Sequence, residues 1–136
     1  RDRQFFSHSN ESRLQARQEY VQNIRDNAYT LCIRGTENYS YRLFEVMSAG
    51  RLPVIIDTNM QLPSLAGFGD WNEFSVFVPI GAIASVGERV RRFHDSLTAE
   101  GFEHACRRAR EAFDYLLPHR FFPRLLAGGL FDRPVD

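Results

Sequence analysis

Four closely spaced side chains, Arg34, Ser40, Arg42 and Glu45, have the types and spacing that could hold a phosphorylated ligand. A serine at a helix start leaves the N–H groups of the first turn facing outward, and the positive end of the helix dipole favours an anion there. Guanidinium groups add charge-assisted, often forked, hydrogen bonds to phosphate oxygens. A carboxylate three residues after Arg42 shares its helix face and is suited to ribose hydroxyls. We interpret these residues as half of a nucleotide-sugar site.

Two other interpretations of the same residues remain open. Arg42 and Glu45 can form an i, i+3 surface ion pair worth a few tenths of a kcal/mol, with Gly35 serving only as a turn. Glu37 and Glu45 also stand in an E-x7-E relation, which would place Glu37 by a donor sugar and Glu45 by a ribose. Spacing alone does not separate these alternatives.

The elements that position these residues form a strand, helix and strand. Residues 29–33 and 52–56 are apolar runs of strand length, and Pro53 is acceptable only near a strand start. Residues 40–49 are expected to be a helix with Ser40 as N-cap and Gly50 just after the C-cap. In parallel sheets the ligand crevice lies beyond the carboxyl ends of the strands. That rule selects further candidates that follow the two strands: Arg34, Gly35, Thr36, Glu37, Asp57 and Thr58.

The rest of the chain alternates in the same way. Residues 3–7 and 75–79 are expected to be strands, and residues 14–27, 86–97 and 98–116 amphipathic helices. The long connection 58–74 is either a functional loop or carries a short helix at residues 63–66. Arg107, Arg108 and Arg110 are expected on a solvated helix face, and Trp71 is expected to anchor a loop. Alternating strands and helices predict an α/β fold with a Rossmann-like parallel sheet and helices on both faces.

The length and composition of the chain restrict the class of protein to which it can belong. A chain of 136 residues is sized for one domain, which we place at residues 1–117, followed by an apolar tail, 118–136, that packs on the sheet or on another domain. Hydrophobic residues make up 43% and charged residues 25%, as in ordinary globular proteins. Zero net charge argues against general nucleic-acid binding, and no apolar run is long enough to span a membrane. The chain contains no lysine, so a permanently charged side chain that contacts phosphate must be an arginine.

From Tyr29 onward the chain resembles the exostosin-like glycosyltransferases, glycosyltransferase family 47. The matching elements occur in the family's order: arginine-glycine after a strand, serine-x-arginine-x-x-glutamate, glycine-x-x-proline-valine-isoleucine, leucine-proline and aspartate-tryptophan. In this sequence they are Arg34-Gly35, Ser40/Arg42/Glu45, Gly50/Pro53/Val54/Ile55, Leu62-Pro63 and Asp70-Trp71. The similarity continues through the terminal helices. Ser64 departs from the pattern, since an aromatic residue often follows leucine-proline in the family.

The resemblance implies the C-terminal, donor-binding half of a GT-B enzyme that transfers a sugar with inversion. A nucleoside-diphosphate sugar, with UDP expected, would be the donor in polysaccharide or glycan synthesis, and no metal or cofactor would be required. The saccharide acceptor and the general base are expected in an N-terminal domain upstream of this chain, so the chain would bind donor without turning it over. A bacterial enzyme would act in the cytoplasm or at the cytosolic face of the membrane, and a eukaryotic one in the Golgi lumen. Retaining GT-B transfer and a non-catalytic interaction module are the alternatives.

Overall fold

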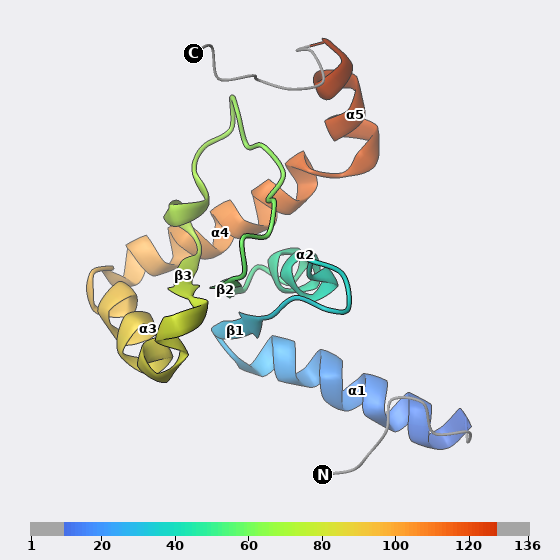
Figure 1. Ribbon diagram of the computed structural model, residues 1–136, viewed down its shortest axis with the longest axis vertical. Helices are drawn as coiled ribbons and strands as arrows, with labels where there is room; N and C mark the ends of the chain where they lie inside the picture. Colours follow the sequence, from blue (N-terminus) through green and yellow to red (C-terminus); the bar gives the residue numbers. More distant parts are fainter. Residues whose placement is uncertain (1–9, 128–136) are drawn as a thin grey trace.

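The computed structural model describes residues 10–127, which form an open α/β structure (Figure 1). Its sheet contains β1 (Tyr29–Cys32), β2 (Leu52–Asp57) and β3 (Val76–Pro79), in that spatial order and all parallel. The α/β class and the parallel sheet are therefore confirmed. The strand expected at residues 3–7 lies outside the described residues.

The helices cover both faces of this sheet. On one face, α2 (Tyr41–Ser48) and α4 (Ala99–Tyr115) pack against the side chain of Ile55. On the other face, α3 (Val86–Asp95) covers Val54 and Ile56. Because side chains alternate along a strand, neighbouring residues of β2 supply the two separate clusters. A strand with both faces covered is a nearly continuous apolar run, as the sequence of β2 predicts.

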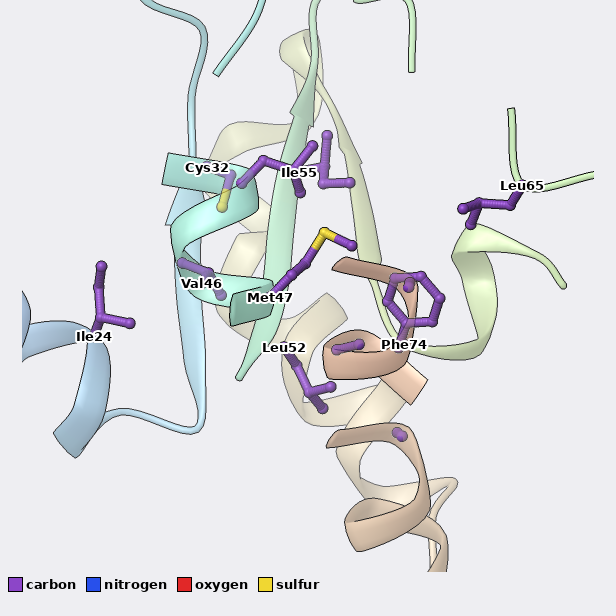
Figure 2. Close-up of a cluster of buried hydrophobic side chains, with 12 residues drawn as sticks. Ile24, Cys32, Val46, Met47, Leu52, Ile55, Leu65 and Phe74 are labelled. Atoms are coloured by element: carbon purple, nitrogen blue, oxygen red, sulfur yellow. The ribbon is translucent and has the colours of Figure 1, made fainter. Parts of the chain in front are cut away.

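The larger cluster holds α2 in place at the sheet. Figure 2 shows Met47 of α2 directed toward Phe74, which precedes β3, with Leu52 and Ile55 nearby. The fully buried members from α4 are three alanines, Ala105, Ala109 and Ala112, and larger side chains of the same helix pack against the cluster while partly buried. The small alanine side chains allow α4 to lie close to α2. The position of the α2 start at the carboxyl end of the sheet therefore depends on a packed core.

The end of α2 follows the glycine signal in the sequence. Gly50 has a φ of +64°, the left-handed conformation that a glycine adopts without steric cost. Its N–H donates to the carbonyl of Met47, and the N–H of Arg51 donates to the carbonyl of Val46. These two bonds form a Schellman motif, which ends the helix and turns the chain into β2.

Helix α1 (Asn10–Asp26) joins the sheet near β1 and extends outward from it (Figure 1). Only Ile24 of this helix is fully buried, and Leu14 stays exposed. The Arg51 guanidinium donates to the Arg25 carbonyl at 2.5 Å and links the end of α1 to the turn before β2. The helix expected at 14–27 is thus confirmed, with few contacts to the rest of the chain.

The connection 58–74 contains no helix at 63–66, where one was a possibility. Its helical turn is η1 (Trp71–Glu73), which begins at a capping box. The Asp70 side chain accepts from the Asn72 N–H at 2.7 Å, and the Glu73 side chain accepts from the Asp70 N–H at 2.8 Å. The aspartate and the glutamate three residues later are a sequence signal for this turn.

Two further elements were not anticipated. A 3-10 segment, η2 (Ile80–Ser85), leads from β3 into α3, and α5 (Pro118–Ala127) forms the described part of the tail. Helix α5 contacts α4, and its Arg124 guanidinium lies 3.6 Å from the centre of the Tyr115 ring. Phe122 and Leu126 of α5 remain exposed. Residues 128–136 of the tail lie outside the described residues.

Candidate functional site

A polar pocket of about 630 Å³ lies where the three strands end. Arg34 follows β1, Asp57 and Thr58 follow β2, and the β3 end contributes Pro79. The pocket therefore lies where a ligand crevice is expected in a parallel sheet, because parallel strands bring their carboxyl ends to one edge. Its remaining lining residues are Asn38, Asn59, Ile80 and Gly81, which the sequence analysis did not select.

Asn38 fixes the loop after β1 against the loop after β2. Its amide donates to the carbonyls of Thr58 and Asn59, both at 3.2 Å, and it accepts from the Thr58 hydroxyl at 2.8 Å. Asn59 has a φ of 57°, and its N–H donates to the Asp57 carboxylate at 2.9 Å. Asparagine adopts this left-handed conformation more readily than most residues, and these bonds fix the backbone beside the pocket.

A second pocket, of about 380 Å³, lies at the start of α2. It is lined by Ile33, Gly35, Thr36, Glu37, Tyr39, Ser40, Tyr41 and Arg42. Because residues 33 and 35 line it while Arg34 lines the first pocket, the two pockets adjoin along one loop. A hydrogen bond of 3.0 Å from the Gly35 N–H to the Tyr39 carbonyl closes that loop.

Ser40 lies at this second pocket in an unusual state for a helix N-cap. Its backbone is extended, with φ −131° and ψ 114°, as an N-cap requires, but its side chain makes no capping hydrogen bond. The residue is only 4% exposed, but its hydroxyl is not among the buried side-chain atoms that lack a partner, which within residues 10–127 are Thr30 Oγ1, Arg51 Nε and Ser75 Oγ. Because the helix does not use this hydroxyl as a cap, the hydroxyl can bond to a ligand oxygen in the pocket. The predicted position of Ser40 is confirmed, although the predicted capping bond is absent.

Arg42 and Glu45 are joined through a third residue, Tyr20 of α1. The Tyr20 hydroxyl donates to the Glu45 carboxylate and accepts from Arg42 Nε at 3.2 Å, and the guanidinium carbon lies 4.5 Å from the ring centre. Burial, followed by the bond to Glu45, raises the pKa of Tyr20. Arg42 and Glu45 are therefore neither a direct surface ion pair nor two side chains without protein partners.

Glu45 lies in a third hollow, between α1 and α2, with a volume of about 800 Å³. Apolar side chains of both helices line it, and several arginines surround them: Arg13, Arg17, Arg25 and Arg51. Tyr41 lines this hollow and also the pocket at the α2 start. The predicted site residues are thus distributed over three neighbouring hollows around the start of α2, with Arg34, Asp57 and Thr58 in the first and Glu45 in the last.

Arg108 of α4 holds the long loop that follows β2, which corrects its expected place on a solvated helix face. Its side chain is only 17% exposed and bonds the Glu73 carboxylate at 3.0 Å and the Phe68 carbonyl at 2.8 Å. The guanidinium carbon also lies 3.8 Å from the centre of the Phe68 ring. Trp71 anchors the same loop, as expected, by donating to the Pro63 carbonyl at 3.1 Å.

We expect Glu73 to make stability depend on pH. The Asp70 N–H, and to a smaller extent Arg108, hold the pKa of this carboxyl below its ordinary value of 4.5, although partial burial opposes them. A depressed folded-state pKa adds stability above the unfolded-state value, and this is lost as pH falls through the folded-state value. The stability advantage of wild type over Glu73→Gln should decrease between pH 5 and 3, by about 1 kcal/mol at most, because the Glu73 side chain is 40% exposed.

Urea denaturation of both proteins from pH 7 to pH 3 measures this difference directly. Taking the difference between the two proteins removes the titration of the other carboxylates. A stability difference that stays constant over this range would show that the carboxylate charge of Glu73 does not stabilise the loop.

The described residues form an open parallel α/β structure with a polar pocket at the carboxyl edge of the sheet and a smaller, mostly apolar pocket at a helix start beside it. Residues 1–93 match the family model of the exostosin GT47 domain, and the chain belongs to this family, which implies glycosyltransferases in general. The match ends within α3, so the resemblance of the terminal helices stays a prediction. No solved structure matches the chain significantly. Within residues 10–127, no helix has the length and apolar character needed to cross a membrane.

Proposed function

We propose that this chain is the donor-binding half of a GT-B glycosyltransferase that uses a nucleoside-diphosphate sugar, with UDP as the expected nucleotide. One observation carries the proposal: Ser40, a buried residue whose side chain makes no capping hydrogen bond, lies at the start of α2, in a pocket that Arg42 also lines. The N–H groups of the first helical turn have no intrahelical partner and favour an anion. Hydroxyl, N–H groups and guanidinium together suit a diphosphate.

The adjoining pocket supplies a place for the sugar. Arg34 lies between the two pockets in sequence and is exposed, so its guanidinium is free to offset the second phosphate charge. Beyond it, the Asp57 carboxylate and the backbone of Thr58 can form hydrogen bonds with sugar hydroxyls. In this scheme the arginines and the helix dipole stabilise the departing diphosphate, and no metal is needed.

Transfer itself would require a second domain. An acceptor hydroxyl, deprotonated by a base from an N-terminal domain, would displace the nucleoside diphosphate in line with inversion at the anomeric carbon. The retaining alternative is supported by Glu37, an exposed carboxylate that lines the Ser40 pocket. Glu45 follows it after seven intervening residues, which gives the E-x7-E spacing. The anomeric configuration of the product of the complete enzyme distinguishes the two.

Nucleotide binding by the purified chain tests the proposal. A ligand that binds only the folded state stabilises it by about 2.7 kcal/mol at a hundredfold excess over its Kd. We expect at least one of UDP, GDP and ADP, added at millimolar concentration, to raise the melting temperature. No rise with any of them would favour the third possibility, a non-catalytic α/β interaction module.

A further inference from the structure

Tyr41, the first residue of α2, is a large side chain that the fold leaves in solvent. It is 72% exposed, although the residue before it, Ser40, is buried. Tyr41 lines both the pocket at the start of α2 and the hollow between α1 and α2. Folding therefore gains little from this ring, which separates two hollows at the edge of the proposed diphosphate site.

A second tyrosine fixes the orientation of this ring. Tyr39 lies edge-on to Tyr41, with 5.0 Å between the ring centres and 90° between the ring planes. The Tyr39 hydroxyl also donates to the Tyr41 hydroxyl at 3.1 Å. Edge-to-face pairs are favourable in aromatic interactions, and two exposed rings that hold each other lose less freedom when a ligand binds.

The direction of a bound donor follows from the neighbouring pockets. If the diphosphate lies by Ser40 and the sugar extends past Arg34 toward Asp57, the nucleoside must leave on the opposite side. That side is formed by Tyr41 and Glu45, which stand four residues apart on one face of α2 and line the same hollow. The flat Tyr41 ring suits a nucleobase. The Glu45 carboxylate accepts from Tyr20 through one oxygen, and its other oxygen can accept from a ribose hydroxyl.

We infer that Tyr41 stacks against the nucleobase of the donor and that Tyr39 holds Tyr41 in position for it. The inference rests on the proposed function, because it takes the diphosphate to be at the start of α2. Every nucleobase has a π face, so stacking on Tyr41 contributes affinity with little choice between bases. Discrimination between nucleobases then depends on other groups of the protein.

The test measures binding of two probes, the nucleoside diphosphate that stabilises the wild-type chain most and inorganic pyrophosphate, by isothermal titration calorimetry. We expect Tyr41→Ala to weaken nucleoside diphosphate binding about tenfold or more and to leave pyrophosphate binding unchanged. Tyr41→Phe keeps the ring and should bind nearly as wild type does. Phe122→Ala, which removes an exposed ring on α5, is the matched control and should change neither.

Each other outcome has a distinct meaning. Unchanged nucleoside diphosphate binding by Tyr41→Ala would overturn the inference while the diphosphate site stands. Equal losses for both probes would also overturn it, because Tyr41 would then act on the helix start and not on the base. If the wild-type chain binds neither probe, the proposed function fails first and the role of Tyr41 falls with it.

Discussion

Replacing Arg42 by alanine is expected to weaken nucleoside diphosphate binding by about tenfold to a hundredfold. Loss of a hydrogen bond to a charged group costs about 1.5–3 kcal/mol, and Arg42 is the cation that shares the Ser40 pocket with the α2 start. Calorimetric Kd values for wild type and variant measure the effect. Pyrophosphate should lose affinity in parallel, because the missing contact is to phosphate.

Two comparisons make the Arg42 result specific. Arg92→Ala removes an exposed arginine of α3 that pairs with Glu88, and it should leave binding unchanged. Arg42→Ala also removes the contact with Tyr20, so the melting temperature of each variant shows whether α1 stays in place. If a folded Arg42→Ala variant binds nucleoside diphosphate with wild-type affinity, Arg42 does not contact the phosphate groups.

Replacing Phe74 by alanine should destabilise the fold by about 3–5 kcal/mol. Phe74 is 0% exposed and belongs to the cluster that joins α2, α4 and the sheet, with its ring 5.6 Å from that of Trp71. A loss of this size is a large part of the stability of a domain this small, and much of the protein would be unfolded. Urea denaturation measures the change in free energy.

The exposed aromatic residue Phe122 provides the control for this prediction. Phe122→Ala should change stability by less than about 0.5 kcal/mol, because surface substitutions away from special features have small effects. A loss of under about 1 kcal/mol for Phe74→Ala would contradict the packed core that positions the start of α2.

The strand-helix-strand unit around α2 was predictable because its signals are local. Apolar runs marked β1 and β2, the serine marked the helix start, and Gly50 marked the left-handed turn after the helix. The same rule that selected Asp57 and Thr58 after β2 would have selected Ile80 and Gly81 had it been applied to β3 as well. Asn38 gave no such signal, because its role depends on the approach of two loops.

Contacts between segments that are distant in the chain could not be predicted from the sequence. Tyr20 joins Arg42 to Glu45 only because α1 packs beside α2, and the spacing of Arg42 and Glu45 alone suggested a direct pair. Arg108 appeared to belong to a solvated face because its partners, Phe68 and Glu73, come from a loop with no regular periodicity. Helical periodicity identifies the side of a helix that faces the core, and it does not identify a loop that covers the other side.

The central claim is that the start of α2 binds the diphosphate of an activated sugar. Backbone amide NMR of the chain, titrated with a nucleoside diphosphate, tests it most directly. The claim predicts that the largest shift changes fall on Gly35 and on Tyr41, Arg42 and Leu43 at the first turn of α2. Saturable changes confined to other parts of the chain, or none at millimolar ligand, would contradict it.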